Sequence, residues 1–310
     1  MKVAAEPAVS VADSAGFDAW AASELQAVES ALERWVPADA PAGLGAAMRY
    51  GVLDGGKRLR PLLVLAACRA VAGQREAALR AAVAVELIHA YSLVHDDMPC
   101  MDNDVLRRGK PTVHVQYGQA QAMLAGDAMQ ALAFEVLTPE HSLPPTLQAR
   151  LVALLARAAG HAGMAGGQAI DLGSIGHTLQ EADLCDMHRR KTGALLHASV
   201  LMGAACGPDA ARGSRVETAL SDYGAAVGLA FQVVDDILDA TQASATLGKT
   251  AGKDQDHNKP TYVTVLGLPT ARRRAESLRQ QAHAALADSG LGSAAALLAV
   301  LADKVVERDS

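Results

Sequence analysis

Two aspartate-rich clusters each follow an apolar stretch of the chain, and their members are Asp96, Asp97 and Asp102 in the first cluster and Asp235, Asp236 and Asp239 in the second. In the second cluster, a helix that advances about 100° per residue places Asp235 and Asp239 about 40° apart, on one face. Carboxylates in apolar surroundings are costly unless a cation compensates them, and their oxygens are ligands that Mg²⁺ prefers. The two clusters together therefore predict a magnesium site, whereas one cluster alone is equally typical of a solvated helix end.

The first cluster needs a break in its helix to form such a site. On a continuous helix, Asp96 and Asp102 lie about 120° apart. Pro99 disfavours helical geometry at Met98 and lacks a backbone N–H donor. We therefore expect a helix end or bulge here that returns Asp102 towards Asp96.

Basic residues occur in short, turn-like motifs near both clusters. Residues 55–61 open a predicted helix, residues 107–111 follow the first cluster, Lys191 and Thr192 follow a polar helix start, and Lys249 and Lys259 follow the second cluster. Mg²⁺ is commonly held by a few carboxylates together with substrate phosphates, and arginine binds phosphate oxygens in a bidentate manner. Each cation taken singly is a typical surface charge, but together with the aspartates they predict a diphosphate-binding site.

Composition limits the class of protein. The chain has 310 residues, of which 50% are hydrophobic, 20% charged and 3% aromatic, and its net charge is −6. These values exclude disorder as the main state, and they disfavour nucleic-acid binding because neither a basic groove nor an aromatic stacking platform is available. The four cysteines have no Cys-x-x-Cys spacing, and the first residues do not resemble a signal peptide, so we expect a cytoplasmic protein. No apolar run approaches the length of about 18 residues that a membrane span requires.

Apolar residues recur with helical spacing from Phe17 onward, as in the stretch from Ala84 to Val94, and no segment shows convincing strand alternation. Neither a long linker nor a repeat is evident. The sequence predicts an all-α protein with a single domain of roughly ten helices over residues 17–310, preceded by a loosely ordered extension over residues 1–16.

The ordered motifs resemble the bacterial-type trans-isoprenyl diphosphate synthases, which carry a polyprenyl synthetase domain, and most of all the farnesyl diphosphate synthases (geranyltranstransferases) among them. The matching segments are residues 55–61, 88–109, 191–193, 231–236 and 246–250. The resemblance covers most of residues 20–305. It implies antiparallel helices around a deep central cavity (the isoprenoid synthase fold), a homodimer, and about three Mg²⁺ ions with substrate bound.

The resemblance also implies roles for individual residues. All six clustered aspartates correspond to metal ligands. The isopentenyl diphosphate site corresponds to Lys57, Arg60, His89 and Arg108. The allylic diphosphate site corresponds to Arg107, Lys191, Thr192, Gln232, Lys249 and Lys259. Lys191, Thr192 and Gln232 are the catalytic candidates, and the oxygens of Thr192 and Gln232 would face the allylic carbon.

The implied reaction is a Mg-dependent, head-to-tail prenyl transfer. Isopentenyl diphosphate condenses with dimethylallyl and then geranyl diphosphate to give farnesyl diphosphate, through an allylic cation that must be shielded from water. In this family the residue five before the first aspartate limits product length. That residue is Tyr91, followed by Ser92, so we expect arrest at fifteen carbons, although Tyr91 is also compatible with an ordinary core position.

The sequence is also compatible with other functions. A geranylgeranyl or geranyl diphosphate synthase would use the same site. A terpene cyclase normally has one aspartate-rich motif and an aromatic pocket, which the aromatic content of 3% disfavours. A non-catalytic partner subunit typically lacks some of the aspartates or basic residues that are present here. We also expect the loop with Lys249 and Lys259 and the tail after Gly292 to close over the site.

Overall fold

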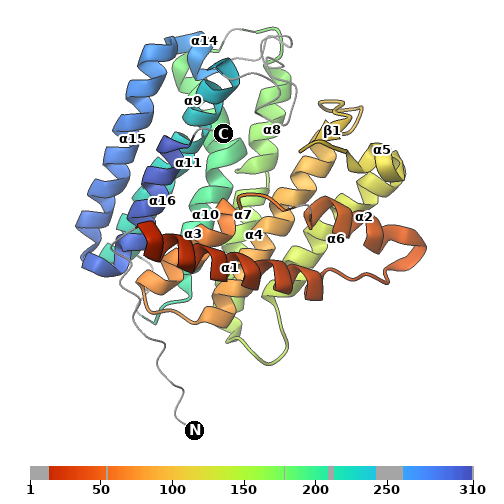
Figure 1. The fold of residues 1–310 in the computed structure, drawn as a ribbon, viewed down its shortest axis with the longest axis horizontal. Coiled ribbons are helices and arrows are strands. Elements are labelled where there is room, and N and C mark those ends of the chain that lie inside the picture. The colour runs from red at the N-terminus through yellow and green to blue at the C-terminus, as the bar shows by residue number, and fades with distance from the viewer. Residues whose placement is uncertain (1–13, 54, 178, 209–212, 242–260, 309–310) are drawn as a thin grey trace.

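The structure is a computed structural model that describes residues 14–53, 55–177, 179–208, 213–241 and 261–308. It confirms the all-α class, because nearly every described element is a helix (Figure 1). The only strands in these ranges are β1 (Leu106–Arg107) and β2 (Lys110–Pro111), which form an antiparallel hairpin. The two residues between them, Arg108 and Gly109, have φ angles of 52° and 77°, as a tight two-residue hairpin turn requires. Strands of two residues are too short to produce an alternating pattern.

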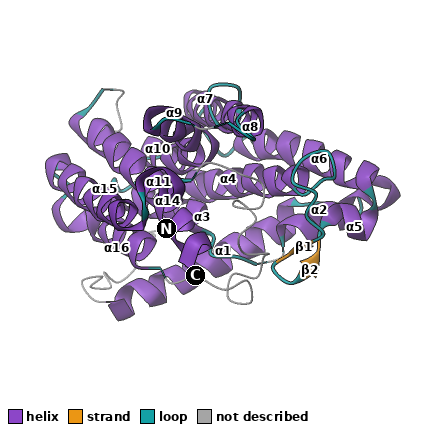
Figure 2. Ribbon diagram, turned by 90° about the horizontal axis from the view of Figure 1, so that it is seen from above, coloured by secondary structure: helices purple, strands orange, loops and turns teal. Residues whose placement is uncertain are grey.

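The α-helices are, in chain order, α1 (Ser14–Trp35), α2 (Leu44–Val52), α3 (Leu59–Ala70), α4 (Arg75–Asp96), α5 (Val113–Tyr117), α6 (Gln119–Leu137), α7 (Pro145–Ala159), α8 (Met164–Gly173), α9 (Glu181–His188), α10 (Ala194–Ala205), α11 (Arg215–Thr241), α14 (Tyr262–Leu266), α15 (Leu268–Ser289) and α16 (Ala296–Glu307). Short 3₁₀ turns precede α2 (Pro41–Gly43) and α16 (Gly292–Ala295), and a π-helical turn (Arg189–Gly193) joins α9 to α10. The helices form one bundle, with α15 and α16 on one side, α2, α5 and α6 on the other, and α1 packed across α3 and α4 (Figures 1 and 2).

The central helix α4 packs against α3, α6 and α10. By length and composition it could span a membrane, but 72% of its most apolar window is buried inside the bundle. A helix that is apolar on all sides is typical of the core of a large protein. Five alanines in its first half, at positions 77, 78, 81, 82 and 84, are fully buried and keep neighbouring helices close. The helix is therefore a core element of this fold.

A buried ion-pair network fixes the loop that opens α3. The Arg58 guanidinium donates to Glu29 at 2.7 Å, to Glu86 at 2.6 Å and to the carbonyl of Val52 at 2.6 Å. Arg58 has a φ of 46°, which is the left-handed region, and only 3% of its side chain is exposed. Since α1 and α4 supply the two carboxylates, they hold the backbone between Lys57 and Arg60 in one conformation.

Helix α16 shows that most of the chain after Gly292 is not a free tail. Its side chains Leu297, Leu298, Leu301 and Val305 are buried in the core. A truncation after Gly292 would therefore remove a core helix as well as any closing segment. Within the described chain, only Arg308 follows α16.

Candidate active site

The first aspartate cluster has the geometry that Pro99 predicts. Helix α4 ends at Asp96, and the chain then turns back so that the backbone N–H of Asp102 donates to the carbonyl of Asp96 at 2.8 Å. The N–H of Asp104 likewise donates to the carbonyl of Asp97 at 3.0 Å. The helix end therefore brings Asp102 back beside Asp96, which confirms the expected break.

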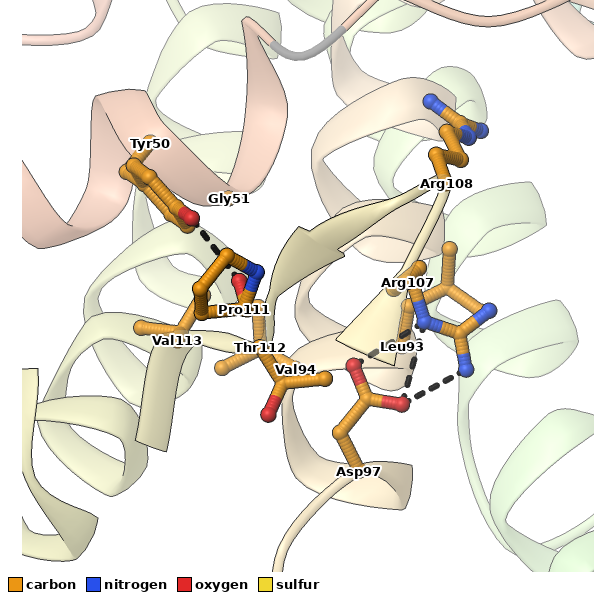
Figure 3. A pocket seen from close by; sticks show the side chains of 10 residues that line it. All are labelled: Tyr50, Gly51, Leu93, Val94, Asp97, Arg107, Arg108, Pro111, Thr112 and Val113. Atoms are coloured by element: carbon orange, nitrogen blue, oxygen red, sulfur yellow. Dashed lines mark hydrogen bonds and ion pairs between the residues drawn. The ribbon is translucent and has the colours of Figure 1, made fainter. Parts of the chain in front are cut away.

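Asp97 is bound by an arginine from the hairpin. Arg107 donates through Nε to both carboxylate oxygens, at 3.0 and 2.9 Å, and through Nη2 to Oδ1 at 2.6 Å (Figure 3). Asp97 is 2% exposed. A bidentate contact of this kind has a defined geometry, so in this structure Asp97 orients Arg107, and its oxygens are engaged by that cation.

The neighbouring Asp96 is only partly compensated by nearby cations. Its pKa is raised to about 6, chiefly by burial and also by Asp102, although Lys191 and Arg107 lower it in part. A nearby divalent cation would offset this cost because it favours the ionised carboxylate. Asp96 therefore has the chemistry of a metal ligand.

The second cluster lies on α11, where Asp235 and Asp239 are one turn apart, as predicted. Asp236 is buried and accepts hydrogen bonds from the Gln232 amide at 2.8 Å and from the backbone N–H of Tyr262 at 2.7 Å. Asp236 thereby ties α11 to the start of α14. Like Asp97 in the first cluster, it orients its neighbours.

Among the described residues, no group of three or more His, Cys, Asp or Glu side chains converges as a preassembled metal site. Mg²⁺ is commonly held by one or two carboxylates, waters and substrate phosphates. The carboxylate oxygens of Asp96, Asp102, Asp235 and Asp239 are donors of the kind that this mode of binding uses.

The predicted catalytic residues lie on the π-helical turn and on α11. The Thr192 hydroxyl donates to the Gln232 side-chain oxygen at 2.9 Å, and the Gln232 amide donates to Asp236. A π-helical turn is often found at functional sites because it changes the direction of the side chains it carries. The structure thus joins Thr192 and Gln232, which are 40 positions apart in the sequence.

Two polar residues of α8 belong to the same region and were not predicted from the sequence. Asp171 forms an ion pair with Lys191 at 2.6 Å. Gln168 lines the cavity described below, and neither atom of its buried amide group has a hydrogen-bond partner among the described residues. The available signal was the placement of Gln168 and Asp171 three positions apart in an otherwise small and apolar helix.

The residues assigned to isopentenyl diphosphate come from the loop before α3 (Lys57), the first turn of α3 (Arg60), α4 (His89) and the β1–β2 turn (Arg108). Arg108 donates to the carbonyl of Gly55, and its guanidinium packs against Gly56, where an added Cβ would lie 2.7 Å from it. Arg60 and His89 line the cavity, and the buried Nε of Arg60 has no partner among the described residues. Burial lowers the pKa of His89 well below its ordinary value, and Arg60 and Arg108 lower it further. His89 is therefore a neutral hydrogen-bonding group at pH 7.

Lys57, the fourth residue assigned to isopentenyl diphosphate, is exposed. Burial and then Arg308 lower its pKa. Arg308 was not predicted from the sequence to belong to the site. It donates to the carbonyl of Phe231 at 2.7 Å and to Asp235 at 3.3 Å. Its guanidinium also lies 4.0 Å from the centroid of the Phe231 ring. The C-terminal end of the described chain thus contributes a cation to the site. Lys249 and Lys259 lie outside the described residues.

A cavity of about 390 Å³ extends between α4, α8 and the π-helical turn. Asp96, Lys191 and Thr192 line it together with Tyr91 and Ser92. Since Tyr91 precedes Asp96 by five residues, it lies about 7.5 Å further down α4 at 1.5 Å per residue. The cavity therefore continues from the charged groups to the tyrosine that was expected to limit product length.

The sequence and the fold are similar to those of known prenyl diphosphate synthases. A profile described as polyprenyl synthetase matches residues 41–290. The farnesyl diphosphate synthase of Geobacillus stearothermophilus is 44% identical over 289 residues, which cover 92% of this chain and 96% of that protein. Large subunit 1 of the heterodimeric geranylgeranyl pyrophosphate synthase of Arabidopsis thaliana, a chloroplastic protein, is 44% identical over 290 residues, or 92% of this chain and 77% of that protein.

A solved structure, the geranyltransferase from Helicobacter pylori complexed with magnesium and isoprenyl diphosphate, is similar with a TM-score of 0.83 at 31% identity, and the match covers 99% of this chain and 100% of that chain. The helical fold and its paired aspartate clusters define an isoprenoid synthase, and the chain belongs to the polyprenyl synthetase family. The protein is accordingly a prenyltransferase, a trans-prenyl diphosphate synthase.

Proposed function

We propose that the protein is a Mg-dependent farnesyl diphosphate synthase. It condenses isopentenyl diphosphate with dimethylallyl diphosphate and then with geranyl diphosphate. The observation that carries the product assignment is Tyr91, whose ring lines the cavity below Asp96. A bulky ring at this depth supports arrest at fifteen carbons, and the relative from Geobacillus stearothermophilus is named as a farnesyl synthase.

The residues of the chain divide the work of the reaction. Arg107, held by Asp97, and Lys191, held by Asp171, bind the allylic diphosphate and stabilise its growing negative charge as it leaves. Magnesium, held by Asp96, Asp102, Asp235 and Asp239, would supply further charge neutralisation of the leaving diphosphate. Lys57, Arg60, His89 and Arg108 orient isopentenyl diphosphate.

The oxygens of Thr192 and Gln232 stabilise the developing cation, and the hydrogen bond between these side chains holds them together. The apolar part of the cavity excludes water that would trap this cation as an alcohol. After the new carbon–carbon bond forms, the departed diphosphate accepts the proton, so the reaction requires no protein base.

The second candidate is a geranylgeranyl diphosphate synthase, because the relative from Arabidopsis thaliana is as similar in identity and carries that name. The two products are distinguished by incubating purified protein with Mg²⁺, dimethylallyl diphosphate and isopentenyl diphosphate, and then analysing the dephosphorylated alcohols by mass spectrometry. A dominant fifteen-carbon alcohol supports the proposal. A twenty-carbon alcohol contradicts the product assignment, and no elongation supports a non-catalytic partner subunit.

The role of Tyr91 is tested separately by Tyr91→Ala, which opens the cavity and should lengthen the product. Tyr117→Ala is the matched control, since Tyr117 packs against Tyr50 on another part of the molecule and does not line the cavity. An unchanged fifteen-carbon product from Tyr91→Ala would contradict the assignment.

A homodimer is also proposed. Val115 of α5 and Met123 and Leu124 of α6 are exposed apolar side chains, with exposed fractions of 49%, 40% and 53%. Neighbouring exposed apolar residues are typical of interfaces, and light scattering after gel filtration would report the mass. A monomeric mass at micromolar concentration would contradict this proposal.

A further inference from the structure

The hydroxyl of Tyr91 is hydrogen-bonded across the bundle. The Gln130 side-chain amide on α6 donates to it at 3.2 Å. Gln130 does not line the cavity and is itself exposed. This contact joins the ring that bounds the cavity to a residue that does not itself line it.

Helix α6 also contacts the Tyr91 ring indirectly, through His95 of α4. The His95 ring meets Tyr91 edge-on, with centroids 5.7 Å apart and planes at 75°. The Nε2 of His95 lies 3.0 Å from the carbonyl oxygen of Met123. Gly126 makes this position possible, because a Cβ on Gly126 would lie 2.0 Å from that nitrogen. Helix α6 therefore restrains the Tyr91 ring both at its hydroxyl and, through His95, at its edge.

We propose that Gln130 is a positioning residue for product length, which holds the Tyr91 ring across the end of the cavity through the hydrogen bond to its hydroxyl. The inference rests on the proposed function, because it assumes that Tyr91 limits elongation.

The Tyr91 side chain has two alternative positions, one across the end of the cavity and one turned aside. With the hydrogen bond, the ring has one preferred orientation, and a prenyl chain of fifteen carbons meets it. Without the hydrogen bond, the buried hydroxyl loses its partner on α6 and the ring gains freedom to turn aside. The loss of a net hydrogen bond changes such an equilibrium by about fivefold. We therefore expect a similar change in the ratio of twenty- to fifteen-carbon products.

The experiment compares three substitutions of surface glutamines. Gln130→Met keeps the length of the side chain but removes the amide, and should raise the product ratio about fivefold. Gln130→Glu keeps an oxygen that can accept the tyrosine hydrogen, and should retain the product of the unsubstituted protein. Gln281→Met, on the exposed surface of α15, is the matched control and should leave the ratio unchanged.

A double-substitution cycle identifies the hydroxyl as the target of Gln130. Tyr91→Phe removes the hydroxyl, so Gln130→Met should add nothing to the product ratio in that background. Equal effects of Gln130→Met in both backgrounds would overturn the proposal, since they would show that Gln130 acts by another route. No change in the ratio from Gln130→Met would also overturn it. Gel filtration of each variant checks that its oligomeric state is unchanged, and any shift in product that follows a change in assembly counts against the proposal.

The outcomes also separate this inference from the proposed function. If the unsubstituted protein makes mainly twenty-carbon or longer products, the farnesyl assignment fails. If it makes fifteen carbons and Tyr91→Ala lengthens the product, but Gln130→Met does not, the farnesyl assignment stands and only the role of Gln130 fails.

Discussion

The carboxylate of Asp171 lies 2.6 Å from the ammonium nitrogen of Lys191, and this ion pair connects α8 to the π-helical turn. Only 6% of the Asp171 side chain is exposed, against 26% for Lys191. The buried carboxylate therefore positions the lysine at the edge of the cavity, where its charge can reach a substrate phosphate.

Asp171→Asn should impair catalysis by leaving Lys191 without its charged partner. A hydrogen bond to a charged group contributes about 1.5–3 kcal/mol, so we expect kcat to fall about tenfold to a hundredfold. Steady-state kinetics with geranyl and isopentenyl diphosphate would measure this. Asp183→Asn, at an exposed position on α9, is the control. Equal kcat values for the two variants would show that the ion pair has no part in turnover.

Gly167 sets the distance between α8 and Lys191. A Cβ at this position would lie 2.2 Å from the backbone nitrogen and 2.6 Å from the Cα of Lys191. Since backbone atoms must then move, Gly167→Ala should lower the free energy of unfolding by about 1–3 kcal/mol. Denaturant unfolding would measure this change, if the free energy of unfolding falls with denaturant concentration at the same slope in both proteins.

Gly173 provides the matched control in the same helix, because no atom lies within 4 Å of an added Cβ there. Gly173→Ala should be neutral or stabilising by up to about 1 kcal/mol, since alanine favours the helix. If Gly167→Ala were as well tolerated as Gly173→Ala, the close approach of α8 to Lys191 would be refuted.

We expect Asp96 to lower the free energy of unfolding when no metal is bound. Its pKa is about 6 in the folded protein, against an ordinary value of 3.8. A raised carboxyl pKa means that the folded state binds more protons than the unfolded state between these values, so the contribution of Asp96 becomes more unfavourable as pH rises to about 6. Asp96→Asn should therefore raise the metal-free Tm by a few degrees near neutral pH.

The pH dependence distinguishes this charge effect from packing. Below about pH 3 the carboxyl is protonated in both states, so the Tm difference between the two proteins should disappear. Differential scanning calorimetry in chelator across this range would show it. A difference that is constant with pH would contradict the electrostatic explanation, and the variant should in any case lose most of its activity with Mg²⁺.

Arg308 should contribute to the binding of isopentenyl diphosphate. Its guanidinium lies next to Asp235 and lowers the pKa of Lys57, so it is close to both groups. We expect Arg308→Ala to raise the KM for isopentenyl diphosphate about tenfold, as loss of a charged phosphate contact does, with a smaller change in kcat. Lys304→Ala is the control, because Lys304 pairs with Asp18 on the outer surface. The same KM in both variants would exclude Arg308 from the site.

The local arrangement of the candidate metal-binding aspartates could be predicted, because it depends only on their spacing along the chain. Asp235 and Asp239 are one helical turn apart in any helix, and Pro99 disfavours helical geometry at the residue before it. The resemblance added roles for Thr192 and Gln232. The structure places these two side chains in contact.

Other parts of the site could not be predicted from spacing, because they depend on contacts between distant segments. Nothing in the local sequence distinguishes Asp97, which binds Arg107, from Asp96, which faces the cavity. The position of Arg308 could not be predicted from the sequence, because a single cation outside any motif is typical of a surface residue.

The sequence by itself determined that this protein is a helical bundle with two clusters of aspartates and a set of cations suited to a diphosphate, since helical periodicity and residue chemistry are local properties. Only the tertiary structure decided which partner each charge has and what lies behind the cavity. Gln130 is 39 positions from Tyr91, and Asp171 is 20 positions from Lys191. Such pairs form only when packing of the apolar helix faces brings the elements together, and that packing depends on the whole chain.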